Sequence, residues 1–347
     1  MDASILRRAW SWRKDAAGAL LYWSGLGAGF QAVKRPGGAI ILMYHSIAPD
    51  EVAHSIDPPN RIAPEVFERQ MRFLHAHRRV VSMSELAEQL EAGRTPEVGT
   101  VCITFDDGYL DNLTTVAPIL DKYRLPATLF LPTAYIDRAE NQWADVLHVQ
   151  FTKRSADRLA LPALKVDADL SRSAELASAR CAIHMHLLQA EYAQRSALLQ
   201  EVARQLKPVG AAMPRLTMNW DEVRELVRRH PRFEIGGHSR DHIDLMTHDG
   251  AVAEREIRGC ASDLARELGP GARHFSFPYG RWREETRAIV RASGWRSAVA
   301  STDALRIGPA SDRFVLGRPQ TPSSMTELRF RTSGAYPGAL ALFGLHA

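Results

Sequence analysis

The segment Val101–Asn112, VCITFDDGYLDN, places two adjacent carboxylates at the end of an apolar run. Val101–Phe105 is short and rich in β-branched residues, which predicts a buried strand. Asp106 and Asp107 follow directly, and Gly108 permits a sharp chain reversal. Two like charges side by side are costly unless a cation lies between them. A divalent metal would bind one carboxylate and leave the other free as a base, so the segment predicts hydrolytic chemistry, with a merely acidic turn as the alternative.

Two histidines, His238 and His242, follow a second strand-like run, Phe233–Gly236. Histidines four residues apart share one face of a helical turn, so such a turn would bring both imidazoles to one ion. Two imidazoles and one carboxylate, here from Asp107, are the ligands of many hydrolytic zinc sites, which keep one position open for water. The pKa of water bound at such a site falls to roughly 7, and Asp106 is the expected base. Two exposed imidazoles at a helix start are the alternative.

Strand-like and helix-like runs alternate through most of the chain. The expected strands are Ala39–Tyr44, Arg79–Ser82, Thr100–Phe105, Ala127–Leu131, Phe233–Gly236, His274–Phe277, Arg296–Ala300 and Arg313–Leu316. Four expected helices are Pro64–His77, Asp221–Arg229, Ala251–Leu268 and Glu284–Ala292. A fifth is capped by Ser84 and ends near Gly93. A sixth runs from the acidic turn to about Arg124, with a kink at Pro118. This alternation predicts parallel strands joined by βαβ crossovers, and eight runs fit a (β/α) barrel better than an open sheet.

The chemically distinctive residues come directly after the strand-like runs. In parallel barrels the active site lies at the C-terminal ends of the strands, so these residues are expected to meet there. They are His45, Asp106, Asp107, His238, His242, Pro278–Gly280 and Arg318.

The segment from about 137 to 215 interrupts the alternation. We expect no strand in it, and the composition of Ala174–Leu206 predicts one or two helices. His184 and His186 lie two residues apart and so on different helix faces, which argues against a shared metal there. The expected organisation is an N-terminal extension (1–35), a barrel (36–330) with a helical insertion (about 137–215), and a tail (331–347).

Composition restricts the class of protein and its partners. The 347 residues are 45% hydrophobic and 24% charged, as in an ordinary soluble protein. A net charge of +4 gives no argument for nucleic-acid binding. The widely spaced Cys102, Cys181 and Cys260 are expected to be free thiols, which suits a reducing compartment.

The N-terminal segment has the outline of a signal peptide. Basic residues precede a moderately apolar stretch, Ala16–Phe30, but glycines break this stretch and it is too short to span a bilayer. Interleaved aromatic and basic side chains predict an interfacial helix, with a helix packed on the domain as the alternative. We expect a cytoplasmic protein in peripheral contact with the inner membrane, with export through an atypical signal as the alternative.

Three motifs in order resemble the polysaccharide deacetylase family (NodB homology domain, carbohydrate esterase family 4). They are TFDDGY (Thr104–Tyr109), HSRDH (His238–His242) and FPYG (Phe277–Gly280), and the resemblance extends over roughly Ala39 to Gln320. It implies a distorted (β/α) barrel and metal-dependent removal of an acyl group, usually acetyl, from an amino sugar in a glycan. It also implies that Asp106 is the base and that the metal ligands are Asp107, His238 and His242.

The chain departs from the family pattern at two positions. The third motif usually begins with an arginine that orients the base, but Ser276 stands there, and Arg318 in GRPQTP is a candidate replacement. The usual C-terminal histidine acid is not evident. Instead, MYHSI (Met43–Ile47) resembles the poly-N-acetylglucosamine deacetylase branch, in which this histidine, here His45, is the general acid. A strand-end histidine bonded to the backbone is the alternative.

The expected function is deacetylation of an N-acetylhexosamine in a glycan or lipid-linked precursor. The expected cofactor is zinc, with cobalt or nickel as alternatives. The main-chain N–H of Tyr109 is a candidate oxyanion donor. Candidates for further substrate contacts, including a sugar-stacking wall, are Pro278, Tyr279, Gly280, Arg318, Trp220 and Trp143. The alternatives are an O-acetyl esterase of xylan-like chains, a deformylase or amidase, and an inactive glycan-binding protein.

Overall fold

The structure is a computed structural model that describes residues 38–301, 306–319, 321–322 and 324–333. The extension expected over residues 1–35 and the tail from residue 334 onward lie outside this part of the chain. Among the helices of the described residues, none combines the length and the apolar character needed to cross a bilayer.

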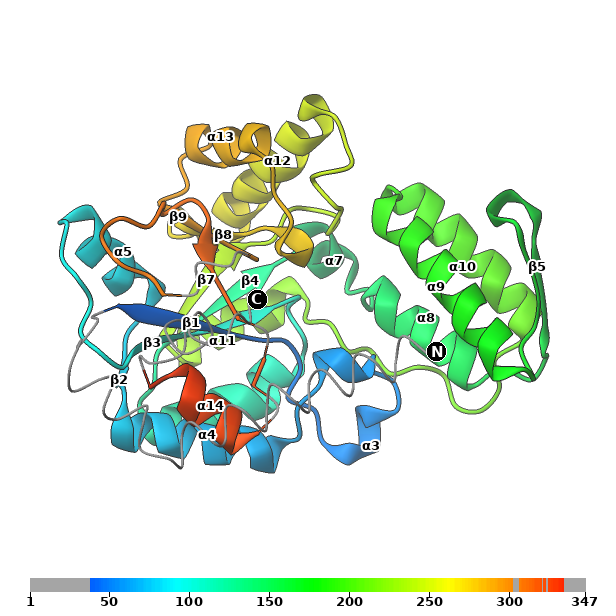
Figure 1. Cartoon of the computed structure of the whole chain (residues 1–347), viewed down its shortest axis with the longest axis horizontal. Coiled ribbons are helices and arrows are strands. Elements are labelled where there is room, and N and C mark those ends of the chain that lie inside the picture. The colour runs from blue at the N-terminus through cyan, green and yellow to red at the C-terminus, as the bar shows by residue number, and fades with distance from the viewer. Residues whose placement is uncertain (1–37, 302–305, 320, 323, 334–347) are drawn as a thin grey trace, which may run out of the picture.

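A parallel sheet of eight strands forms the centre of the molecule (Figure 1). The strands are β1 (Ala39–Tyr44), β2 (Arg79–Val80), β3 (Thr100–Asp106), β4 (Ala127–Leu131), β7 (Phe233–Gly237), β8 (His274–Ser276), β9 (Ser297–Ala300) and β10 (Leu316–Gly317). Their order is β1-β3-β4-β7-β8-β9-β10, and β2 pairs with the start of β3. Ala39 also forms a bridge to Ile307, between β9 and β10, so the sheet is nearly closed. The expected barrel is confirmed, and every expected strand has a counterpart, but the last one begins at Leu316 and not at Arg313 as expected.

Helices follow most strands and cover the outside of the sheet. They are α3 (Asp50–Ala53), α4 (Pro64–His77), α5 (Met83–Glu91), α6 (Ala117–Tyr123), α7 (Thr133–Arg138), α11 (Trp220–Arg229), α12 (Gly250–Leu268), α13 (Glu284–Ala292) and α14 (Met325–Arg331). The expected cap Ser84 is wrong: Ser82 Oγ accepts the N–H of Glu85 and caps α5.

Aromatic packing fixes β1, β3 and α4 against one another. The rings of Tyr44, Phe67 and Phe105 are fully buried, with centroids 5.3 to 5.7 Å apart. Phe67 belongs to the buried stripe of α4, which also contains Met71 and Leu74 at helical spacing. Tyr44 and Phe105 pair in register, so His45 and Asp106 follow side by side at the ends of adjacent strands.

The helix after the acidic turn begins irregularly. Asn112–Val116 is a π-helical turn that passes into α6 close to Pro118, which cannot donate an N–H to the preceding turn. Asp111 lies at the start of this turn and makes no side-chain cap hydrogen bond to it. Its carboxylate instead binds the segment after β1, as described below.

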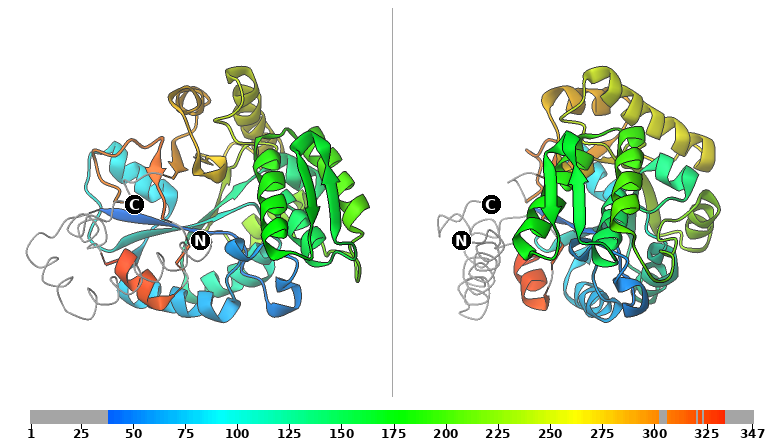
Figure 2. Two further views of the ribbon diagram at one scale, coloured as in Figure 1. Left: turned by 45° about the vertical axis from the view of Figure 1, so that its right-hand side comes forward. Right: turned by 90° about the vertical axis from the view of Figure 1, so that its right-hand side faces the viewer.

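The insertion forms its own small subdomain beside the barrel (Figure 2). It contains α8 (Trp143–Thr152), β5 (Arg158–Leu161), β6 (Val166–Asp169), α9 (Ser173–Gln189) and α10 (Tyr192–Leu206). The two expected helices are confirmed, but the expectation of no strand is wrong. β5 and β6 form an antiparallel hairpin that buries one face in a separate apolar core. Four residues per strand give too short an alternation to stand out in the sequence.

Candidate metal centre and active site

The acidic turn separates its two carboxylates through an unusual backbone. Asp107 and Gly108 both have positive φ, 75° and 68°, a conformation that Asp tolerates better than most residues and Gly adopts freely. A Cβ at position 108 would lie 2.8 Å from Leu131 Cδ2 and 2.9 Å from Ile136 Cδ1, so the positive φ and these contacts together favour glycine. The reversal leaves Asp106 on the strand end and turns Asp107 towards the histidine pair.

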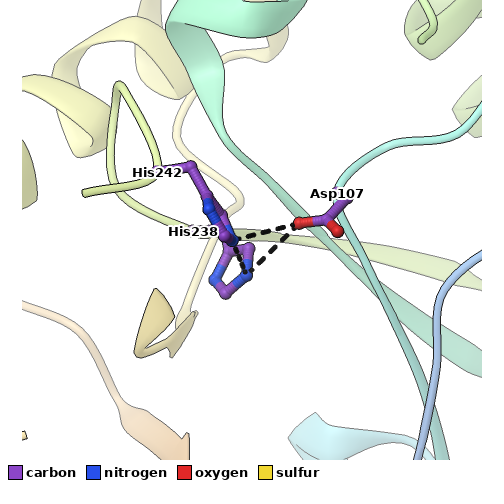
Figure 3. A group of neighbouring side chains, drawn as sticks. All are labelled: Asp107, His238 and His242. Carbon is purple, nitrogen blue, oxygen red and sulfur yellow. Dashed lines mark hydrogen bonds and ion pairs between the residues drawn. The ribbon is translucent and has the colours of Figure 1, made fainter. Parts of the chain in front are cut away.

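Asp107, His238 and His242 place three ligand atoms in one small triangle (Figure 3). Asp107 Oδ1 lies 3.6 Å from His238 Nε2 and 3.2 Å from His242 Nε2, and the two Nε2 atoms are 3.2 Å apart. A tetrahedral ion about 2.1 Å from each ligand requires ligand atoms about 3.4 Å apart. The triangle therefore fits a single divalent cation.

The partners of the imidazole Nδ1 atoms also fit a cation. His238 Nδ1 lies 2.7 Å from the main-chain oxygen of Ser276, so it must donate its proton there and leave Nε2 with a free lone pair. His242 Nδ1 lies 3.1 Å from the hydroxyl oxygen of Tyr279, which can accept its proton in the same way. Two lone pairs and a carboxylate oxygen then face one another, and a cation relieves their mutual repulsion.

Burial and neighbouring charges favour the forms that bind a metal. Burial lowers the pKa of His238 to about 4, so its imidazole is neutral at neutral pH. Burial opposes ionisation of Asp107, but the charge and hydrogen bond of His242 outweigh it and hold the pKa of Asp107 well below its usual range. At neutral pH the centre thus offers an anionic Asp107 and a neutral His238.

The helical turn expected at the histidine pair is wrong. Residues 238–242 form a loop after β7, in which Ser239 and His242 have φ of 60° and 49°. These left-handed residues bend the chain so that both imidazoles face Asp107. The three side chains therefore converge through a loop, and not through the helical turn that the spacing suggested.

Asp106 is held by an arginine that follows the last strand of the sheet. Arg318 follows β10 and donates to both oxygens of Asp106, at 2.8 and 2.6 Å, with both side chains buried. It also donates to Thr104 Oγ1 and to Ser276 Oγ. Burial opposes ionisation of Asp106, but Arg318 outweighs it and lowers the pKa of Asp106. Arg318 therefore occupies the orienting role that Ser276 cannot fill.

Arg318→Lys is expected to lower kcat by at least about tenfold while leaving metal affinity unchanged. Lysine carries a point charge and cannot form the two parallel bonds that fix the plane of Asp106. Arg313→Lys is the matched control, because Arg313 lies at the surface and pairs with Glu91. Steady-state kinetics and metal titration check this, and an unchanged kcat would show that the bidentate contact is dispensable.

His45 lies directly beside Asp106 at the end of β1. The charge of His45 contributes to the lowered pKa of both Asp106 and Asp107, so it acts on the same centre. Its Nδ1 is buried without a hydrogen-bond partner among the described residues. This atom therefore gives no support to the alternative in which the His45 side chain is hydrogen-bonded to the backbone.

Asp111 and Asn112 anchor the segment that carries His45. Asp111 accepts from Ser46 Oγ at 2.5 Å and from the N–H of Ile47 at 2.9 Å, and burial raises its pKa to about 6. Asn112 Nδ2 donates to the main-chain oxygen of His45 at 3.0 Å. The acidic motif therefore also fixes the neighbouring strand end.

The main-chain N–H of Tyr109 lies next to the acidic turn, and its carbonyl oxygen accepts the N–H of Asn112. Its bridge to Thr217 is flanked by bonds from Leu110 N–H to Leu216 O and from Met218 N–H to Gly108 O. In such a pair the N–H of Tyr109 points away from the partner segment. The Tyr109 side chain is buried, and its hydroxyl donates to Asp145 at 2.7 Å.

Two of the aromatic candidates for a sugar-stacking wall, Trp220 and Trp143, are buried, and Tyr279 is partly buried. Trp220 is buried in the main core and donates its indole N–H to Asp137, so its expected substrate contact is wrong. Trp143 is buried in the insertion and donates to Tyr279 Oη at 2.9 Å. Tyr279 lies edge-on to His242, as a support for the ligand. Pro278 and Gly280 form the turn that carries Tyr279.

Two residues of the insertion that support the site, Asp145 and Arg195, were not identified from the sequence. Asp145 on α8 accepts from Tyr109 Oη and from the N–H of Asp57, and burial raises its pKa to about 7. Arg195 on α10 contacts the histidine loop. Both stand in helical stretches where charged residues ordinarily face solvent, so nothing in the local pattern marks them.

Comparison with known proteins gives one family throughout. The family model for polysaccharide deacetylase matches residues 93–298. YxkH of Bacillus subtilis (strain 168), which is named for the same family, is 35% identical over 99 residues. This match covers 28% of this chain and 33% of YxkH, so the chain matches about a third of the length of that relative.

Solved structures share the fold. The deacetylase PplD of Streptococcus pyogenes, in complex with acetate, gives a TM-score of 0.54 at 18% identity, over 86% of this chain and 99% of PplD. IcaB from Ammonifex degensii gives 0.53 at 17% identity, over 87% of this chain and 97% of IcaB. Since the matched family model spans more than half of the sequence, the chain belongs to the polysaccharide deacetylase family (NodB homology, carbohydrate esterase family 4), a family of hydrolases.

Proposed function

We propose that this protein is a metal-dependent deacetylase that hydrolyses the N-acetyl group of an N-acetylhexosamine in a glycan or glycan precursor. The observation that carries the proposal is that an oriented carboxylate lies next to a set of metal-ligating side chains. Asp106, oriented by Arg318, lies beside the triangle of Asp107, His238 and His242, with His238 Nε2 3.7 Å from Asp106 Oδ2. An oriented carboxylate beside a metal-ligand set supplies a general base and a site for metal activation, two groups that accelerate hydrolysis of an acyl group.

The bound cation is proposed to be zinc, with cobalt or nickel as alternatives. Two imidazoles and one carboxylate in a compact triangle suit Zn²⁺ and leave a position open. A divalent ion held by Asp107, His238 and His242 would supply Lewis-acid polarisation of an acyl oxygen and a lowered pKa of water. The remaining steps belong to side chains and main-chain groups of the protein.

Asp106 is the base that removes a proton from the attacking water. Arg318 occupies one lone pair on each oxygen, and a carboxylate has about four such sites, so acceptor capacity remains. Attack forms the new C–O bond and moves negative charge onto the acyl oxygen. The main-chain N–H of Tyr109 is positioned beside the turn as a donor to that charge, and loss of one such donor costs about 10²–10³ in rate.

His45 is the acid that protonates the leaving nitrogen as the C–N bond breaks. An amine departs as an unstable anion unless it receives a proton, whereas the alkoxide of an ester departs more readily. His45 lies across the strand ends from Asp106, so base and acid flank the acyl group. The products are acetate and a free amino sugar. This position of His45 favours the N-acetyl substrate over the O-acetyl alternative.

His45→Ala is expected to lower N-deacetylation by about 10²–10⁴ and to reduce ester hydrolysis much less. Parallel assays on an N-acetylated chito-oligosaccharide and an acetyl ester measure the two effects. His77→Ala is the control, since His77 is an exposed histidine of α4 on the outside of the barrel. Equal losses on amide and ester would mean that His45 does not act by protonating the leaving nitrogen.

Release of the acyl group, measured as acetate or as formate, tests the proposal directly. The panel consists of acetylated hexosamine oligosaccharides, acetylated xylan, a formylated amide and lipid-linked acetylated sugars, each with and without added Zn²⁺. Release from the hexosamine substrates alone supports the proposal. Release from xylan alone would indicate an O-deacetylase, and a protein that binds glycan and metal without any release would be an inactive binder.

A further inference from the structure

The insertion carries a fully buried arginine that reaches the loop of the metal ligands. Arg195 on α10 is 1% exposed. Its Nη1 donates to the main-chain oxygen of Asp241 at 2.8 Å, and its Nη2 donates to that of His242 at 3.0 Å. Its Nε donates to the main-chain oxygen of Leu187 at 2.7 Å, which ties the same guanidinium to α9.

The environment of Arg195 is unusual for a buried charge. All the acceptors of its hydrogen bonds in the described chain are neutral oxygens, and its guanidinium lies 5.6 Å over the ring of Trp143. A guanidinium stays protonated, so its burial costs free energy unless its donors are satisfied. Its planar fork matches two consecutive carbonyl oxygens, which a compact ammonium group does not.

The loop that Arg195 holds is strained and is held from both sides. Ser239 and His242 have positive φ, and non-glycine residues persist in that conformation only where surrounding contacts fix them. From α12, Glu256 accepts the N–H groups of Arg240 and Asp241 at 3.0 and 2.8 Å. Arg195 binds the carbonyl groups that follow, so the barrel fixes one side of the loop and the insertion fixes the other.

A second contact from the insertion reaches the imidazole of the same ligand. Trp143 Nε1 donates to Tyr279 Oη, which lies 3.1 Å from His242 Nδ1 and donates to the main-chain oxygen of His242 at 3.0 Å. Arg195 Nη2 lies 3.4 Å from the same hydroxyl. Backbone and ring of His242 are thus both oriented by groups that the insertion supplies or holds.

We propose that the helical insertion sets the geometry of the metal centre, with Arg195 as the positioning residue that fixes the His242 loop. This inference rests on the metal centre proposed above. It assigns the insertion a role in metal affinity and ligand geometry. Arg195 touches neither the ion nor the reacting atoms, so it acts through His242 and Tyr279.

Arg195→Met is expected to weaken metal affinity by about 10- to 100-fold, as loss of a group that orients a ligand commonly does. Arg204→Met is the matched control, because Arg204 lies on the same helix, is exposed and pairs with Glu201. Zn²⁺ affinity is measured by competition with a chromophoric chelator, and the visible absorption of the Co²⁺ form reports ligand geometry. We expect a changed spectrum for Arg195→Met and a wild-type spectrum for the control.

Two further variants decide the matter if Arg195→Met does not fold. Arg195→Lys keeps the charge but not the fork, and Trp143→Phe keeps the packing but not the donor to Tyr279. Weaker affinity and an altered spectrum in either folded variant support the inference. Unchanged affinity and spectrum, even with a lower Tm of the metal-free protein, would mean a purely structural arginine and would overturn it. A wild-type protein that binds no metal would instead overturn the proposed centre itself.

Discussion

His238→Ala is expected to abolish metal binding and hydrolysis together. Removal of Nε2 takes away one corner of a triangle with sides of 3.2 to 3.6 Å, leaving Asp107 and His242 as a two-ligand remnant. The loss of metal affinity should exceed the roughly 10- to 100-fold loss that follows removal of a residue that only orients a ligand. Metal content after dialysis and acetate release, measured on the same preparation, check both effects.

The control for this prediction is His186→Ala. His186 is exposed on α9 in the insertion and lies outside the ligand cluster. Metal content and rate should stay at the wild-type level in this variant. Exhaustive chelation of the wild-type protein should stop hydrolysis, and added Zn²⁺ should restore it; full activity of the chelated protein would falsify the metal mechanism.

Asp106→Asn is expected to keep metal affinity near wild type and to lower kcat by about 10²–10⁴. The amide is nearly the same size as the carboxylate but cannot take a proton from water. Asp106 Oδ2 lies 3.7 Å from His238 Nε2, outside the triangle of ligand atoms, so the ion should remain bound. Metal titration and steady-state kinetics separate the two roles.

Asp106→Asn is also expected to destabilise the fold, and a double variant separates this effect from the loss of the base. The neutral amide would leave the buried Arg318 without its anionic partner, and breaking a buried pair from one side costs about 3–5 kcal/mol. Asp106→Asn combined with Arg318→Met removes both charges and should recover part of the free energy of unfolding without recovering activity. A near-wild-type kcat in the folded single variant would mean that another group is the base.

The link between Asp106 and Arg318 shows how far sequence patterns reach. Both residues follow strand-like runs, which was sufficient to place them at the same end of a barrel. Their bidentate contact depends on β10 lying near β3 across the nearly closed sheet, although the two residues are 212 positions apart. Local patterns predict the strands, and only the order of the strands decides which ends meet.

The histidine loop shows the opposite case. A spacing of four residues indicated correctly that the imidazoles of His238 and His242 lie together beside Asp107, although the helical turn inferred from it is wrong. Side-chain chemistry restricts the ligand set strongly, because few residue types bind a divalent ion. It restricts the backbone weakly, since a loop with two left-handed residues presents the same atoms.

The sequence by itself determined the alternating architecture, the acidic turn, the ligand set and the candidate acid and base, because these depend on residue types and on periodicity along the chain. Only the tertiary structure decided that Trp220 is a core residue, that a hairpin completes the insertion, and that Arg195 reaches His242. Burial and hydrogen-bond partners depend on segments distant in sequence. A charged residue on a helix looks the same in sequence whether that face meets water or a neighbouring loop.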